Sequence, residues 1–470
     1  MYSAVVKKIG ISVFANIFGL TASLIVAFVV PKILDNKVDQ FGYFQLFLLY
    51  ESFVGFFHFG ILDGLYLRDG GKDYDELPKS VYAGQFWSLV SFELLIAICI
   101  LAFGTFSSST EYRFILACIG ISVFIYIPAN MLQFVLQATN RIREASISII
   151  INHAIFVLLI FGGYILKEPS FEYFVISYLI SKVGLLISVV YFCVDIVKSK
   201  PSSLIKGVHI CIDDFKIGYN LLIANVIGLL INGIVRLEIQ DNWDISTFGI
   251  VSFSLNIANM VLVMINAVSV VFFPMFRRIS EERRIKYFRM IEDSLLVLLF
   301  FFLIFYYPIY IVLDAWLPVY SESFRYAAIL FPMCIFASKT NLLLTTYMKV
   351  YRMEKQIKIL NIYTLIFSVI TSAFSIYILN SITLAVFTIL LSQVFRCYAS
   401  EYVLHHNLSL GSYRNVMIEF FMASLFIWAN WLVCGWVGFL IFLIGFTIVV
   451  CIQKDQIFQF YTIYKQIKHN

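Results

Sequence analysis

The chain has 470 residues, of which 61% are hydrophobic and only 13% are charged, with a net charge of +5. Soluble domains have about 25% charged residues, so this much apolar surface cannot be buried in one water-soluble core. The basic residues are dispersed among short segments, which argues against a nucleic-acid partner. The eight cysteines have no CxxC or metal-ligand spacing, which argues against a metal site.

Apolar segments follow one another along the whole chain, each about 17–25 residues long, the length that crosses the hydrocarbon as a helix. In lipid the backbone must pair within a helix or a closed barrel, and alternating strands are absent. The sequence therefore predicts an all-α polytopic membrane protein with about 14 transmembrane helices. The predicted spans are residues 9–33, 41–67, 81–106, 112–137, 145–167, 171–197, 216–239, 247–276, 290–316, 324–349, 356–379, 382–405, 414–434 and 436–453.

Loop charges predict the orientation. Lys and Arg gather in alternate loops, such as "NRIRE" and "RRISEERRIKYFR", and such loops face the cytoplasm. Both termini are therefore predicted to be cytoplasmic. Little more than Gly435 separates the last two spans, so a re-entrant pair is the alternative there.

Short sequence matches recur about two hundred positions apart. "KIG" at 8–10 returns at 216–218, "ANIFGL" at 15–20 returns as "ANVIGL" at 224–229, and "FG" at 41–42 returns at 248–249. The offset covers six helices, an even number, so both copies enter the membrane in the same direction. A parallel repeat of this kind favours a binding site between the halves. We expect an N-lobe at 1–214, a C-lobe at 215–406, and two further helices at 407–470.

Several stretches resemble one family. The residues "FKIGYNLLIANVIGLLINGIVRLEI" (215–239) and the segment from Phe248 to Ser280 are similar to the seventh and eighth helices of the Wzx-type O-antigen flippases. These belong to the multidrug/oligosaccharidyl-lipid/polysaccharide exporter superfamily. "FGYFQLFLLYESFVGFFHFGILDGLYLR", "LQATNRIREASISIIINHAIFVL" and "MKVYRMEKQIKILNIYTLIFSVI" resemble other parts of the same family. The likeness covers about residues 1–406, and it departs at Val235, where family members often have a polar or acidic residue.

The resemblance implies two six-helix lobes around a central cavity that opens to each side in turn. It implies transport of an undecaprenyl-diphosphate-type lipid-linked oligosaccharide, an O-antigen or capsule repeat unit, to the outer leaflet of a bacterial inner membrane. The implied partners are this lipid, membrane lipids, H⁺ or Na⁺, and polysaccharide polymerase machinery. An acid-lined drug/cation antiporter of the same superfamily is the alternative. A polysaccharide polymerase or acyltransferase would have larger outer loops.

Ionisable residues inside spans are costly, so they usually face a cavity or a partner. A diphosphate needs cations, and Arg binds phosphate oxygens in a bidentate way. Arg236, Lys339 and Lys182 are the candidates for the anionic headgroup. The alternatives are that Arg236 snorkels to the interface and that Lys182 pairs with an acid inside its lobe. Glu51 and Glu93 are candidates for ion coupling or for charge partners.

Polar and proline residues within spans complete the candidate set. Amide side chains are candidates for sugar contact, and the alternative is that they join helices to each other. The candidate amides are Asn256, Asn259, Gln133 and Gln137. Pro128 and Pro332 each remove a backbone hydrogen bond, which predicts a bending point or a static kink.

No motif points to an enzyme or a cofactor. The sequence has no Walker or Gly-rich phosphate loop and no Ser-His-Asp set, so we expect an ion gradient to drive transport. "DYD" at 73–75 imitates a metal-binding motif but lacks a nucleotide-binding domain. His405 and His406 lack ligands at metal spacing, so no metal is expected.

Overall fold

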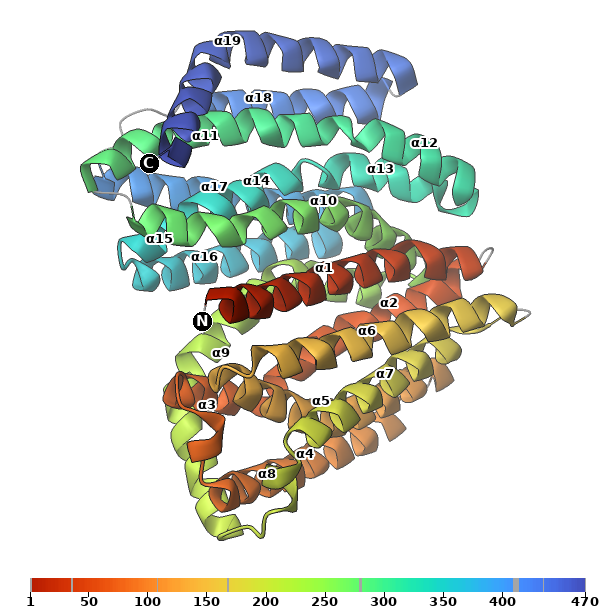
Figure 1. Cartoon of the computed structure of the whole chain (residues 1–470). Helices are drawn as coiled ribbons and strands as arrows, with labels where there is room; N and C mark the ends of the chain where they lie inside the picture. The colour runs from red at the N-terminus through yellow and green to blue at the C-terminus, as the bar shows by residue number, and fades with distance from the viewer. Residues whose placement is uncertain are drawn as a thin grey trace. The chain divides into compact units, whose positions relative to one another are not determined.

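The computed structural model describes the backbone of residues 2–34, 37–107, 109–166, 169–278, 281–408, 414–433 and 435–469. It describes side chains there except in 2–9, 261, 263–287, 289–290 and 455–469. Every element in this part of the chain is helical (Figure 1). The all-α polytopic architecture predicted from the sequence is therefore confirmed.

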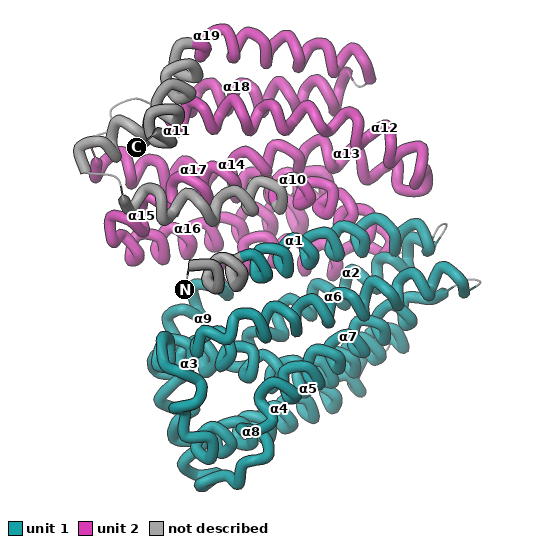
Figure 2. The backbone as a smooth tube through the Cα atoms, in the orientation of Figure 1, with its two compact units in different colours: residues 1–226 teal, residues 227–470 magenta. Residues whose placement is uncertain are grey.

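The chain forms two compact units, Met1–Val226 (unit 1) and Ile227–Asn470 (unit 2), which Figure 2 distinguishes by colour. The boundary falls inside one long helix, α9 (Leu204–Asn242). Unit 1 also holds α1 (Tyr2–Ile33), α2 (Val38–Val54), α3 (Ile61–Asp69), α4 (Lys79–Thr105), α5 (Thr110–Ala138), α6 (Ile142–Ile165), α7 (Phe171–Phe192) and α8 (Val194–Lys198). Unit 2 holds α10 (Ile245–Arg278), α11 (Glu281–Ile304), α12 (Tyr306–Trp316), α13 (Ser321–Leu330), α14 (Met333–Lys339), α15 (Thr345–Val350), α16 (Glu354–Ala373), α17 (Ile382–Leu408), α18 (Arg414–Trp428) and α19 (Gly435–His469).

Among the described residues, eleven helices are long and apolar enough to span a membrane, or thirteen if each of two bent pairs forms one span. The predicted eighth span corresponds to a shorter apolar helix, Ile245–Met260, within these residues. The last two segments, Arg414–Val433 and Gly435–Lys454, each have 20 residues. Each therefore has the length to cross the bilayer by itself.

The same helix pairs pack together in both units. In unit 1, α4 packs on α5, α5 on α7, α6 on α7, and α2 on α5. In unit 2, the corresponding pairs are α11 with α14, α14 with α17, α16 with α17, and α10 with α14. The α1–α6 pair of unit 1 has its counterpart in α9 and α16, where Ser368 Oγ donates to the Ile231 carbonyl at 2.9 Å. Each unit thus repeats one six-span packing scheme.

Two predicted spans are broken. The first bends by 55° between His58 and Ile61, where Phe59 and Gly60 have left-handed backbone angles of φ 49° and 85°. The second bends by 44° between Leu330 and Met333, and Pro332 lies at this break. Pro128, in contrast, lies inside the uninterrupted α5. The break at Phe59–Gly60 was not predicted, although "HFG" contains the glycine that favours it.

The first half of α9 contacts α3 at glycines. An added Cβ at Gly218 would lie 2.0 Å from the Gly60 carbonyl oxygen, and one at Gly64 would lie 2.0 Å from the Asp214 carbonyl oxygen. This close approach lets Arg68 of α3 reach the Asp214 carboxylate at 2.7 Å, while Gln85 Nε2 donates to the same carboxylate at 2.6 Å. Backbone contact and a satisfied polar network therefore hold α3 and α4 against α9.

Candidate functional site

Arg236 lies on α9, six residues before the end of that helix. Its Nη2 donates to Ser252 Oγ at 3.0 Å, and its guanidinium carbon is 5.5 Å from the centre of the Phe248 ring. It forms no ion pair with any residue that the structure describes, and its buried Nε has no hydrogen-bond partner among them. The guanidinium therefore keeps a charge that no described carboxylate neutralises.

A second arginine of unit 2, Arg396, has the same character. It lies on α17, and its Nε donates to Asn361 Oδ1 of α16 at 3.1 Å. Within the described part of the chain it, too, has no carboxylate partner. Arg396 is not among the residues predicted from the sequence, although a charge inside the span 382–405 was the available signal.

Two amides connect the helices that carry these arginines. Gln393 Nε2 of α17 donates to Asn232 Oδ1 of α9 at 2.8 Å. Asn232 precedes Arg236 by one turn, and Gln393 precedes Arg396 by one turn. α17 belongs to the fifth span after that of α9, and successive spans cross in alternate directions, so α9 and α17 run in opposite directions.

The two arginines therefore lie on opposite sides of the amide pair. At 1.5 Å per residue their positions are about 10 Å apart along the helix axes. We call these side chains the polar strip of unit 2; its members are Asn232, Arg236, Asn361, Gln393 and Arg396. Both arginines and Asn232 are partly exposed, whereas Asn361 and Gln393 are buried, so the strip presents two cations and one amide.

Lys339 has a different environment from the one predicted. Its side chain is only 3% exposed, and its ammonium lies 2.9 Å from Glu292, 2.7 Å from Glu401 and 2.7 Å from Glu419. The ammonium donates hydrogen bonds to Glu401 and Glu419 and forms an ion pair with Glu292. Its charge is therefore already paired inside unit 2 rather than directed at a substrate phosphate. Its placement in a closed ion cluster corrects the expectation of a cavity-facing cation.

Lys182 and Glu51 lie near each other in unit 1. Lys182 Nζ is 4.4 Å from the centre of the Tyr126 ring and 4.7 Å from that of Tyr178, and its charge acts on Glu51. Glu51 Oε1 accepts a hydrogen bond from Ser122 Oγ at 2.8 Å. These contacts favour the alternative in which Lys182 is paired inside its own lobe. A coupling role for Glu51 stays a prediction.

Glu93 is the most isolated of the predicted acids. Its side chain on α4 is fully buried, and neither carboxylate oxygen has a hydrogen-bond partner among the described residues. The structure does not bring Glu93 together with any of the predicted cations in an ion pair within that part of the chain. Its coupling role also stays a prediction.

The four predicted sugar-contact amides have unlike surroundings. Gln133 is buried and donates to the Ala145 carbonyl at 3.2 Å, so it joins α5 to α6. Gln137 is exposed, Asn259 is exposed and Asn256 is half-buried. Among the four amides, and counting only partners that the structure describes, Gln133 alone has a helix-joining hydrogen bond.

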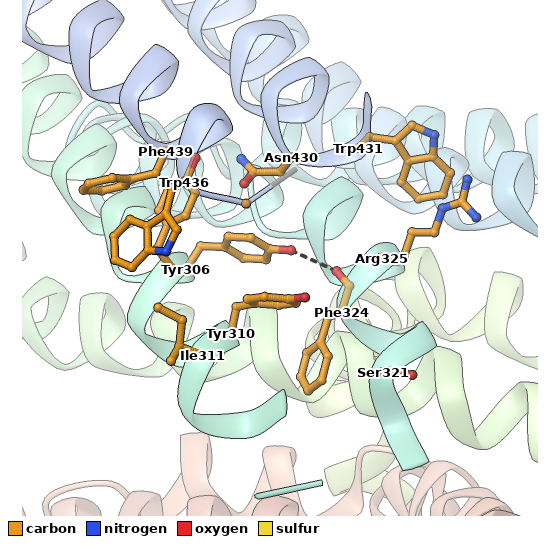
Figure 3. A pocket seen from close by; sticks show the side chains of 12 residues that line it. Tyr306, Tyr310, Ile311, Ser321, Phe324, Arg325, Asn430, Trp431, Trp436 and Phe439 are labelled. Atoms are coloured by element: carbon orange, nitrogen blue, oxygen red, sulfur yellow. Dashed lines mark hydrogen bonds between the residues drawn. The ribbon is translucent and has the colours of Figure 1, made fainter. Parts of the chain in front are cut away.

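An aromatic pocket of about 360 Å³ lies in unit 2 where α12, α13, α18 and α19 end or begin (Figure 3). Its wall includes Tyr306, whose hydroxyl donates to the Phe324 carbonyl at 3.0 Å. The Arg325 guanidinium lies 4.4 Å from the Trp431 ring centre. Trp and Tyr gather at membrane–water interfaces, so we interpret this pocket as part of an interfacial aromatic belt.

The "DYD" segment (residues 73–75) makes a structural contact with α8. Tyr74 is buried, and its hydroxyl donates to Asp195 Oδ1 of α8 at 2.6 Å, while Lys79 Nζ lies 3.4 Å from Asp195 Oδ2. Burial disfavours the charged form of Asp195, but the Tyr74 hydrogen bond and the Lys79 charge outweigh it and lower the pKa of Asp195. Tyr74 thereby joins the loop before α4 to α8.

The fold is shared with known transporters. A solved structure of the lipid II flippase MurJ in an inward closed conformation is similar, with a TM-score of 0.59 and 12% identity over 96% of this chain and 100% of that chain. An inward-facing multidrug resistance MATE family transporter of the MOP superfamily is similar with a TM-score of 0.57 and 14% identity, over 84% of this chain and 94% of that chain. No family model and no curated protein matches the sequence. The chain is thus a multi-pass membrane protein with the fold of these transporters.

Proposed function

We propose that this chain transports a polyprenyl-diphosphate-linked oligosaccharide across a bacterial inner membrane, from the cytoplasmic to the outer leaflet. Both termini are cytoplasmic in this proposal, and the two units open to each side in turn. An H⁺ or Na⁺ gradient drives the cycle, and the polysaccharide polymerase machinery receives the product. An O-antigen or capsule repeat unit is the proposed cargo, in keeping with the resemblance to Wzx-type flippases.

The observation that carries the proposal is the pair of unneutralised arginines in the polar strip. A guanidinium in a transmembrane helix is costly unless a partner or water compensates it. Arg236 and Arg396 have no carboxylate partner among the described residues, so a ligand with negative charge is their natural complement. A diphosphate supplies several oxygen acceptors, and the planar guanidinium matches them in a bidentate way.

The amides of the strip suit the remainder of such a substrate. Amide side chains both donate and accept hydrogen bonds, as sugar hydroxyl groups require. Asn232 is the partly exposed amide of the strip and lies one turn from Arg236, while the buried Asn361 and Gln393 hold Arg396 and Asn232 in place. The strip would therefore bind the diphosphate at the arginines and place the first sugar beside Asn232.

The second candidate function is that of a drug/cation antiporter, because the fold is also similar to that of a MATE family transporter. A binding surface for organic cations would present carboxylates. The polar strip contains two cations and no acid. This charge pattern favours the anionic substrate.

The test is a pair of charge-neutral substitutions, Arg236→Gln and Arg396→Gln, in the parent bacterium without its native copy of the gene. We expect each variant to reduce surface polysaccharide, and the double variant to abolish it, with lipid-linked oligosaccharide accumulating in the cytoplasmic leaflet. Arg325→Gln, an exposed arginine of the same unit, is the matched control and should keep normal output. Protein levels are measured in parallel.

The outcomes separate the two candidates. Normal surface polysaccharide in the double variant, at normal protein level, would remove the substrate assignment. Efflux of a cationic dye from vesicles that contain the wild-type protein, with unchanged polysaccharide in cells that lack it, would establish the antiporter instead.

A further inference from the structure

A cluster of ionisable side chains is buried inside unit 2 and does not include either arginine of the polar strip. Lys339 of α14 lies at its centre, and the three glutamates around it come from three other helices: Glu292 from α11, Glu401 from α17 and Glu419 from α18. Each of the four side chains is at most 5% exposed. Four helices of the unit therefore meet at one group of charges.

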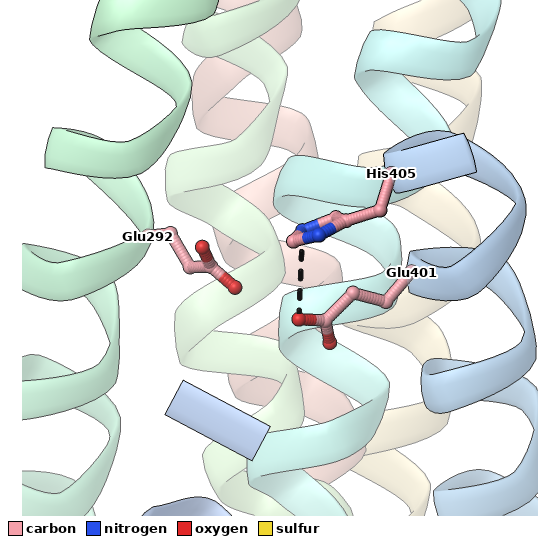
Figure 4. A group of neighbouring side chains, drawn as sticks. All are labelled: Glu292, Glu401 and His405. Atoms are coloured by element: carbon pink, nitrogen blue, oxygen red, sulfur yellow. Dashed lines mark ion pairs between the residues drawn. The ribbon is translucent and has the colours of Figure 1, made fainter. Parts of the chain in front are cut away.

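The charges of the cluster do not balance. One ammonium faces three carboxylates, so two negative charges remain among these four residues. His405 adds its Nε2 at 3.8 Å from Glu401 Oε1 (Figure 4), and even a protonated His405 would leave one negative charge. An uncompensated charge in a low-dielectric interior is strongly unfavourable.

Neighbouring groups have other partners or are neutral. Asp293 of α11 accepts from Asn415 at 2.7 Å and pairs with Arg414 at 3.4 Å. Two further titratable side chains of α17, Cys397 and Tyr398, face the glutamates. Neither carries positive charge. No described side chain thus supplies the missing cation.

Three carboxylate oxygens of the cluster also lack hydrogen-bond donors. Glu292 Oε1, Glu401 Oε1 and Glu419 Oε2 are buried and accept no hydrogen bond from the described residues, although Glu292 Oε1 lies 2.9 Å from the Lys339 ammonium. A buried acceptor without a donor costs free energy that a proton on a neighbouring oxygen would recover. Protonation of one carboxylate would reduce the excess negative charge and would also supply a donor to an unused acceptor.

We propose that the Lys339 cluster is a proton-binding site that takes up and releases an exchangeable proton during transport. Uptake converts one carboxylate to a carboxylic acid, which removes one negative charge and places an O–H beside an unused oxygen. Release restores the anion and its repulsion with the other two carboxylates. Because the four groups belong to four helices, the change in charge favours different packing of α11, α14, α17 and α18.

Proton binding fits this geometry better than metal binding. Ligand atoms of Glu292, Glu401 and His405 do lie within 4.8 Å of one another, as do those of Cys397, Glu401 and Glu419. However, the Lys339 ammonium already occupies the point where the three carboxylates converge, and it would repel a divalent ion there. A proton needs no coordination shell and adds only to one oxygen.

The coupling role rests on the proposed gradient-driven transport, whereas proton binding itself does not. The test is therefore made without substrate, on the purified full-length protein in lipid nanodiscs. Infrared difference spectra between high and low pH detect the carbonyl stretch of a protonated carboxyl group, and exchange into D₂O identifies it. We expect the wild-type protein to show such a band, and Glu401→Gln and Glu419→Gln each to lose or shift it.

Controls keep the test decisive. Glu322→Gln, an exposed acid of the same unit, should leave the band unchanged, and Glu51→Gln and Glu93→Gln report any contribution from unit 1. A band that is the same in wild type and in Glu292→Gln, Glu401→Gln and Glu419→Gln would overturn the proposal. Stoichiometric Zn²⁺ binding that abolishes the wild-type band and requires Glu401 would overturn it in favour of a metal site.

The same measurements separate this inference from the proposed function. A protein that loses its titrating band in Glu401→Gln but moves no lipid-linked oligosaccharide retains the proton site and loses the substrate assignment. Normal polysaccharide output from a wild-type protein that shows no titrating band would retain the substrate assignment and remove the proton site.

Discussion

Replacement of Lys339 by methionine should destabilise the protein strongly. Methionine keeps the length of the side chain but removes the one lysine or arginine charge that contacts Glu292, Glu401 and Glu419 among the described residues. Breaking a buried ion pair by removal of one partner costs about 3–5 kcal/mol, because the other charge stays buried and unpaired. For a folding unit of this size, each kcal/mol lowers Tm by about 2–4 °C. The expected decrease is therefore roughly 6–20 °C.

The assay is thermal unfolding of the purified protein in detergent, followed by tryptophan fluorescence. Lys216→Met is the matched control, since Lys216 pairs with Asp213 at 3.0 Å while both side chains are about two-thirds exposed. Such a surface pair contributes about 0–1 kcal/mol, so Tm should hardly move. Adding Glu419→Gln to Lys339→Met should recover part of the loss, because it removes one of the repelling charges. Equal Tm values for Lys339→Met and Lys216→Met, or no recovery in the double variant, would refute the reasoning.

Two more changes test the helix contacts and the helix break. Gly218→Ala places a Cβ 2.0 Å from the carbonyl oxygen of Gly60, the residue before α3, whereas Gly228→Ala on α9 meets nothing within 4 Å. Gly218→Ala should therefore cost at least about 1–3 kcal/mol in the same unfolding assay, and equal stability of the two variants would contradict the close approach. Pro332→Ala should reduce surface polysaccharide several-fold if the 44° break acts as a bending point, while Pro128→Ala, inside an uninterrupted helix, should not; equal output from both would leave Pro332 as static shape only.

The sequence by itself determined the class of the protein. Hydropathy and helix length act over about 20 neighbouring residues, so the spans can be recognised without knowledge of the fold. The same local criterion found Arg236, an intramembrane cation that has no carboxylate partner among the described residues. It would also have found Arg396, had every charge within the span 382–405 been considered.

Only the tertiary structure decided which charges meet. Lys339 contacts Glu401 and Glu419 across separations of 62 and 80 residues, and nothing in the local sequence specifies that contact. Glu401 lies near the end of the predicted span 382–405, yet the packing of α14, α17 and α18 buries it. Helix register and close approach, as at Gly60 and Gly218, set these distances. The physical reason is that a side chain's position within a span is a local property, whereas its partner depends on how separate helices pack.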